Sequence, residues 1–211
     1  MSCPNVKFQT QLNNPDSTTD GDDCAVICAS VAHDFASCGK FRPTVKQIRN
    51  LDGVPNSGGL TMVQFKNAIT GFKSKYKELG LKVPGCNIFD DGDWDDFDNK
   101  LKNEASTKWL TVFIDYEVWN DLCVEHNKSW SGDREFGGTH AVCARKGRME
   151  NEKWVYDEWD PLYDGRKDQP SNKPVPDGKQ VIPMWWLREA AEGRAGEGQI
   201  EFAVVLKAEP L

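Results

Sequence analysis

The sequence predicts an α+β fold, with helices in the first half of the chain and an antiparallel sheet in the second. Apolar residues recur at helical spacing between residues 24 and 72, and β-branched and aromatic runs follow residue 106. The polar triplet Glu150-Asn151-Glu152 separates two of those runs, as the turn of a hairpin would. A length of 211 residues suits a single domain over 1–211. Its expected parts are an N-terminal arm at 1–22, a helical half at 23–105 and a β-sheet half at 106–211.

Three helices are expected early in the chain. The first begins near Cys24 and is apolar on nearly every side, which predicts a buried helix that stops at Gly39. Thr44 opens a short second helix, and Thr61 caps a third helix over 62–72 that has one apolar face.

The second half of the chain carries the expected sheet. Strands are predicted at 107–116, 140–149, 153–159 and 199–208. The segment 161–183 is rich in Pro, Asp and Gly, which predicts a long surface loop, and a short helix is expected at 184–193.

Charge and hydropathy exclude several classes of partner. The net charge of -7 comes from scattered acidic residues, so no basic surface is expected that would bind nucleic acid. No stretch approaches the roughly 20 apolar residues of a membrane helix, and Met1 to Pro15 lacks the apolar core of a signal peptide. We therefore expect synthesis in a cytoplasm, no membrane partner, and cysteines that are mostly reduced thiols.

Neither a metal nor an organic cofactor is expected. The acidic run 90–98 leads into a short helix but lacks the regular ligand spacing and the closing Glu of a calcium loop, so we interpret it as a solvated helix N-terminus. The seven cysteines include no CxxC pair of the kind that closes a zinc site.

Cys24 is the candidate nucleophile. It lies in the first turn of an apolar helix, with Asp22 or Asp23 available as the N-cap. Unpaired amides and the positive end of the helix dipole favour a thiolate there, whereas the two carboxylates oppose it, so a cationic partner such as an imidazolium is needed. Cys28 lies one turn later, where no amide is free, and is the weaker candidate.

His140 is the leading candidate for the base among three histidines. His33 lies inside the apolar helix on another face than Cys24, which indicates a structural role. His126 lies in a polar stretch that is expected to be an exposed loop. His140 follows Gly137-Gly138-Thr139 and begins a strand, so the backbone can pass close to a substrate while the strand fixes the direction of the ring.

An acid on the next strand would orient this imidazole. If the chain turns at 150–152, the returning strand brings Asp157 back toward His140. Asp160 lies three residues further on and is the alternative.

The order of these residues resembles that of papain-like cysteine peptidases: a cysteine, its helix, a histidine that starts a strand, and an acid on the next strand. Asp23-Cys24 resembles the Asp-Cys opening of the C39-like branch, and Asp160-Pro161 resembles its Asp-Pro. Asp157-Glu158-Trp159 resembles the Asn-Ser-Trp segment of papain, in which the amide orients the histidine and the indole shields that hydrogen bond. The two alignments choose different acids. We favour Asp157, which gives Trp159 the shielding role.

The resemblance implies a papain-like fold and a hydrolase that cleaves peptide or amide bonds through Cys24, His140 and Asp157. It also implies a glutamine as oxyanion donor, for which Gln11 is the candidate. The expected substrate is a peptide or a peptidoglycan-like molecule. The compact form and the eight tryptophans on a polar chain are similar to proteins encoded by bacteriophages in tail or lysis modules. The alternative expectation is therefore an inactive papain-like module of a phage virion, with other virion proteins as partners.

Overall fold

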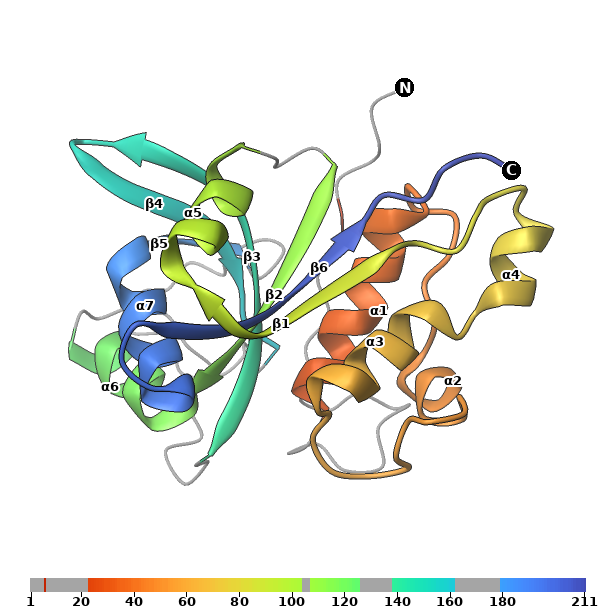
Figure 1. The fold of residues 1–211 in the computed structure, drawn as a ribbon, viewed down its shortest axis with the longest axis horizontal. Coiled ribbons are helices and arrows are strands. Elements are labelled where there is room, and N and C mark those ends of the chain that lie inside the picture. The colour runs from red at the N-terminus through yellow and green to blue at the C-terminus, as the bar shows by residue number, and fades with distance from the viewer. Residues whose placement is uncertain (1–5, 7–22, 104–106, 126–137, 162–178) are drawn as a thin grey trace, which may run out of the picture.

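The fold is α+β, as predicted, and consists of one antiparallel sheet with helices packed on both of its faces (Figure 1). The computed structural model describes residues 6, 23–103, 107–125, 138–161 and 179–211. In order across the sheet, the strands are β1 (Cys86–Asp93), β6 (Gln199–Leu206), β2 (Lys108–Asp115), β3 (Thr139–Glu150), β4 (Lys153–Trp159) and β5 (Lys179–Pro183). Each neighbouring pair is antiparallel.

The helices lie in two groups separated by the sheet. They are α1 (Cys24–Ala36), α2 (Val45–Arg49), α3 (Met62–Thr70), α4 (Lys73–Glu78), α5 (Trp94–Asn103), α6 (Tyr116–Glu125) and α7 (Met184–Ala195). In Figure 1 the group α1 to α4 lies on one side of the sheet and the group α5 to α7 on the other. Strand residues alternate between two cores accordingly. Ala141 and Cys143 of β3 face the core that contains α1, whereas Val142 and Ala144 face the core that contains α7.

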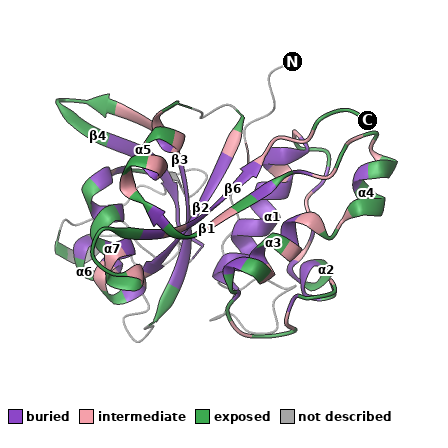
Figure 2. Ribbon diagram, viewed as in Figure 1, coloured by how far each residue is buried: buried purple, intermediate pink, exposed green. Residues whose placement is uncertain are grey.

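The expected helices at the start of the chain are confirmed. The α1 helix is buried along almost its whole length, as its all-round apolar sequence predicts (Figure 2). Thr44 and Thr61 cap α2 and α3, and in each case a glutamine three residues later completes the capping box.

Two strands occur where the sequence predicted none. β1 lies in the half that was expected to be helical, and β5 lies in the expected loop 161–183. β1 is an edge strand that is mostly exposed, so it lacks the apolar pattern by which a strand is recognised in a sequence.

Helices α4 and α6 were also not predicted. The expected strand at 107–116 ends one residue early, because Asp115 accepts hydrogen bonds from the amides of Glu117 and Val118 and so starts α6.

The α1 helix packs against β3 through small side chains. The Cys28 thiol donates a hydrogen bond to the Ala141 carbonyl at 3.5 Å, and Cys28 also interacts with Cys143. Burial is the main cause that raises the pKa of Cys28 well above its usual value, so this thiol stays protonated. Cys28 is thus part of the helix–sheet contact, which agrees with the preference for Cys24 as nucleophile.

His33 has the structural role that was expected. It is fully buried, its Nε2 donates to the Ala68 carbonyl at 3.0 Å, and its Nδ1 accepts from the Tyr76 hydroxyl at 2.9 Å. Burial lowers the pKa of His33 to about 4, against the weaker opposing effect of the Ala68 carbonyl. The ring is therefore neutral at neutral pH.

The expectation of reduced cysteines needs one correction. Cys24, Cys28, Cys86 and Cys143 are free thiols, but Cys38 is disulfide-bonded. Disulfides are most frequent in proteins that work in oxidising surroundings.

Within the residues that the structure describes, no helix has the length and apolarity that a membrane crossing requires.

Candidate active site

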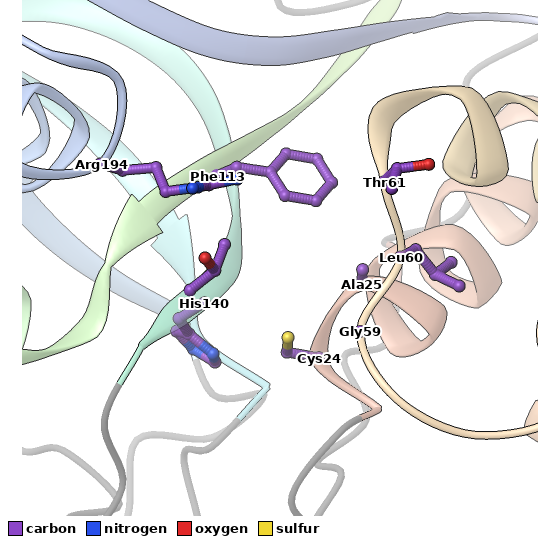
Figure 3. A pocket seen from close by; sticks show the side chains of 9 residues that line it. Cys24, Ala25, Gly59, Leu60, Thr61, Phe113, His140 and Arg194 are labelled. Atoms are coloured by element: carbon purple, nitrogen blue, oxygen red, sulfur yellow. The ribbon is translucent and has the colours of Figure 1, made fainter.

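Cys24 is the first residue of α1 and lines a pocket between the two helical groups (Figure 3). The first hydrogen bond of the helix runs from the Ile27 amide to the Asp23 carbonyl, so the amide of Cys24 lies ahead of the helical ladder. That amide and the positive end of the helix dipole are available to an anion at the position of the thiol.

Asp23 is the N-cap residue of α1, but its side chain makes no capping hydrogen bond, and Asp22, the other residue considered for the N-cap, lies outside the described residues. Its Oδ1 accepts from Arg49 Nη2 at 2.7 Å and from Arg49 Nε at 3.2 Å, and both side chains are buried. Arg49 also donates to the carbonyls of Pro55 and Gly58. The guanidinium thus neutralises the negative charge next to Cys24 and ties the loop before α3 to the start of α1.

His140 lies near the start of β3, where it is fully buried against an acid. Its Nε2 lies 2.6 Å from Oδ1 of Asp160. The other oxygen of Asp160 accepts from the indole nitrogen of Trp119 at 3.2 Å, and the ring of Tyr116 meets the imidazole edge-on at 5.2 Å. The acid that orients His140 is therefore Asp160.

The preference for Asp157 is wrong. Asp157 lies opposite Arg145, which is five positions along β3 from His140, or about 17 Å at the rise of a strand. Its carboxylate instead accepts from Arg148 at 2.8 Å and pairs with Lys146 at 3.7 Å. It is the buried member of an ion cluster on the hairpin whose cations, Lys146 and Arg148, are partly exposed.

A β-bulge decides which acid reaches His140. The pairs nearest the turn are Glu150 with Lys153 and Arg148 with Val155, but beyond the bulge Cys143 pairs with Trp159, one residue out of that register. One step further brings Asp160 opposite Val142, on the sheet face to which His140 also belongs. Without the extra residue Asp160 would lie opposite Cys143 and point to the other face.

The shielding role expected for Trp159 is also wrong. Trp159 points to the α1 side of the sheet and packs on Trp109 at 5.3 Å. The aromatic neighbours of the His140–Asp160 pair are Tyr116 and Trp119 of α6. Sequence reasoning missed both of them because it extended the preceding strand through Tyr116 and did not predict α6.

Glu158 is a second buried carboxyl close to this pair. Neither of its oxygens has a hydrogen-bond partner among the described residues. Burial, and secondly the charge of Asp160, raise the pKa of Glu158 well above its usual value. Burial thus favours the neutral form of Glu158, whereas Asp160 is the carboxyl that contacts His140.

His140 is an imidazolium at neutral pH. Burial lowers its pKa, but the Asp160 carboxylate and then the Cys24 thiol oppose this effect and raise the pKa of His140 to about 10. A hydrogen-bond interaction with the Cys24 side chain contributes to this rise, and Figure 3 shows the ring and that side chain turned toward one another. The cationic partner that the thiolate requires is thus present beside it.

The pocket has a volume of about 230 Å³. Its lining comprises Cys24 and Ala25 of α1, Gly59, Leu60 and Thr61 before α3, Phe113, Thr139 and His140 of the sheet, and Arg194 of α7. Gln11 and His126 lie outside the described residues, so the oxyanion role of Gln11 stays a prediction.

No family model matches the chain, and no curated protein matches it. Among the residues that the structure describes, no group of three or more His, Cys, Asp or Glu side chains is arranged to hold a metal ion.

Proposed function

We propose that this protein is a papain-like cysteine hydrolase that cleaves peptide or amide bonds with Cys24, His140 and Asp160. The observation that carries the proposal is a buried imidazole that is bonded on one side to a carboxylate at 2.6 Å and turned on the other toward a thiol at a helix N-terminus. A nucleophile, a base and a group that orients the base are the three parts of covalent acyl transfer.

The reaction has two halves. In the first, the Cys24 sulfur attacks the carbonyl carbon, the carbon–nitrogen bond breaks, and Nδ1 of the His140 imidazolium gives its proton to the leaving amine. In the second, water attacks the thioester carbon, His140 takes a proton from that water, and the acid leaves as the sulfur recovers its electron pair. The Cys24 amide is one donor for the oxyanion in both halves.

Local charge supports this mechanism. The carboxylate of Asp23 would oppose a thiolate at Cys24, but Arg49 engages it at 2.7 Å. The imidazolium of His140 then acts on the sulfur with little opposition from neighbouring carboxylates.

Alkylation of Cys24 tests the proposal without a known substrate. The native protein is treated with iodoacetamide, and the rate at each cysteine is read by mass spectrometry. We expect Cys24 to react at least tenfold faster than buried Cys86, and H140A to remove that advantage. D157N is the matched control, since it changes an acid that does not touch His140. Uniform slow labelling in the native protein would contradict the proposal.

Hydrolysis is then measured on a mixed peptide library and on peptidoglycan fragments, with C24S as the blank. Cleavage that C24S abolishes supports the hydrolase and identifies the substrate class.

The second candidate function is an inactive papain-like binding module, such as a virion component. One observation favours it: no Asn or Gln side chain is among the described residues that line the pocket, so none of these residues offers a side-chain amide to the oxyanion. Rapid alkylation of Cys24 without hydrolysis of either substrate class would favour this candidate.

A further inference from the structure

Arg194 reaches the pocket of Cys24 and His140 from the last turn of α7. Figure 3 shows it beside Phe113, across the pocket from Thr61. Its position depends on the preceding Gly193, where an added Cβ would lie 3.1 Å from both Asp115 Cβ and Val118 Cγ2. The absence of a side chain lets α7 approach the β2–α6 junction closely.

The charge of the pocket is one-sided. Among the described residues that line it, Arg194 and His140 are cationic and none is acidic. Asp160 pairs with His140 from behind, in a fully buried position. Because His140 is already paired with Asp160, Arg194 is the cation of the lining that is left to meet an anionic group of a ligand.

The guanidinium of Arg194 has donors to spare. Its ion pair with Glu201 joins Nη2 to Oε2 at 3.4 Å, which is longer than the 2.7–2.9 Å of a strong charge-assisted hydrogen bond. About 40% of the side chain is exposed. A planar group with five donors can therefore keep this contact and still offer a pair of N–H groups to a ligand.

The rest of the lining fits a small group with an aliphatic part. Ala25, Leu60 and Phe113 are apolar, and Thr61 and Thr139 carry hydroxyls. The volume of about 230 Å³ is below the range of about 300–1,000 Å³ that is typical of pockets for drug-sized ligands. The pocket suits a group the size of one amino-acid residue.

We propose that Arg194 determines specificity by pairing with a carboxylate of the substrate next to the bond that is cleaved. The carboxylate belongs to an acidic side chain or to a chain terminus. This inference rests on the proposed hydrolase, because it assigns a substrate class to the same pocket.

The first test compares two alkylating reagents of similar size, iodoacetate and iodoacetamide, which differ in charge. In both reactions the Cys24 sulfur forms a bond to the CH₂ carbon and iodide leaves. The rate with iodoacetate divided by the rate with iodoacetamide, both measured at Cys24, reports the attraction of the pocket for a carboxylate. The charge of His140 affects this ratio equally in all variants. R194Q should lower the ratio about tenfold, and R194K should retain part of the native value.

R188Q is the matched control. Arg188 lies on the same helix, carries the same charge and pairs with Glu192, but it is not among the pocket residues. We expect R188Q to leave the ratio unchanged. An equal change in R194Q and R188Q would overturn the proposal, since it would show a long-range charge effect. So would equal slowing of both reagents in R194Q, which would indicate a role in the reaction itself.

The second test uses peptides once cleavage is detected. Glu and Gln at the positions flanking the cleaved bond, and free and amidated C-termini, distinguish the two sources of the carboxylate. We expect kcat/KM to fall about tenfold or more for the uncharged member of one pair, and R194Q to abolish that difference. Cleavage without any preference for a carboxylate would overturn the specificity role and leave the hydrolase intact. If instead the iodoacetate-to-iodoacetamide ratio depends on Arg194 but no peptide is cleaved, the hydrolase is refuted and the carboxylate-binding role of Arg194 stands.

Discussion

Nε2 of His140 lies 2.6 Å from Oδ1 of Asp160, and both side chains are almost completely buried. This contact fixes the ring so that Nδ1 is directed to the pocket, where Cys24 lies. His140 lies on β3 and Asp160 directly follows β4, and the two share a sheet face only because of the bulge between Arg145 and Arg148.

Removal of Asp160 should therefore impair the site far more than removal of Asp157. In D160A the imidazole loses its orientation and its negative partner, so hydrolysis should slow by about 10²-fold or more. D160N keeps an oxygen that can accept from Nε2–H and should retain more activity than D160A. D157A serves as control and should stay within about threefold of the native rate. Equal losses in D160A and D157A would contradict the assignment of the acid.

The pH dependence follows from the pKa of His140. Because burial is outweighed by Asp160 and Cys24, this pKa is about 10 in the fold, against 6.5 for an ordinary histidine. The charged ring thus stabilises the folded state fully below about pH 6.5, and that contribution is lost as the pH rises through 10. Activity should fall on the alkaline side, since the leaving amine then has no proton donor.

NMR titration of the ring nitrogens checks this prediction directly. The His140 signals should titrate near pH 10 in the native protein and at lower pH in D160A. His33, whose pKa is about 4, gives an internal comparison in the same spectra. Titration of His140 near 6.5 would contradict the charged state that we assign to it.

The Asp23–Arg49 pair should matter strongly for stability. R49M would remove the guanidinium from a buried carboxylate and release the carbonyls of Pro55 and Gly58. We expect the free energy of unfolding in urea to fall by about 3–5 kcal/mol. The double variant D23N/R49M should recover part of the loss, because no charge is then left buried.

K82M provides the control for that experiment. Lys82 pairs with Glu209 at 2.9 Å, a similar distance, but both side chains are exposed. Its loss should cost less than about 1 kcal/mol. Similar costs for R49M and K82M would show that burial does not decide the strength of the first pair.

His33 should make the protein sensitive to acid. Its pKa is lowered to about 4 in the fold, so the unfolded chain binds a proton between pH 6.5 and 4 that the folded chain does not. Its contribution to stability is complete above about pH 6.5 and is lost as the pH falls through 4. Urea unfolding at several pH values should show this slope, and H33Q should flatten it. An unchanged slope in H33Q would assign the acid sensitivity to other groups.

Much of the fold could be predicted from local patterns. The all-round apolar run after Cys24 predicts a buried helix, and α1 is buried. The hairpin turn at 150–152 is also confirmed, with positive φ angles at Asn151 and Glu152. Edge strand β1 could not be recognised, because it is mostly exposed and backbone pairing rather than apolar patterning holds it in the sheet. Edge strand β5 has only five residues, of which Ile182 is buried in the core.

The choice of acid depended on a detail that hydrophobic patterns do not encode. Counting from the turn requires the number of residues on each strand, and between Arg145 and Arg148 the bulge gives β3 one residue more than the facing part of β4. The signal in the sequence is Gly147 within a strand, next to Lys146. In the structure Lys146 has a positive φ of 55°, and a Cβ on Gly147 would lie 3.0 Å from Leu101 Cγ. A glycine inside a predicted strand should therefore prompt both registers to be considered.

The small side chains between α1 and β3 have a consequence for how reactivity could be adjusted. Cys28 meets Ala141 there, four residues after the reactive thiol and one residue after the imidazole. The volume of these two side chains sets how closely the helix carrying the sulfur approaches the strand carrying the ring. Larger side chains at these two positions would move α1 away from β3 and so lengthen the distance between the Cys24 sulfur and the His140 ring. Substitutions in the core could therefore weaken the thiolate–imidazolium pair without changing either reacting group.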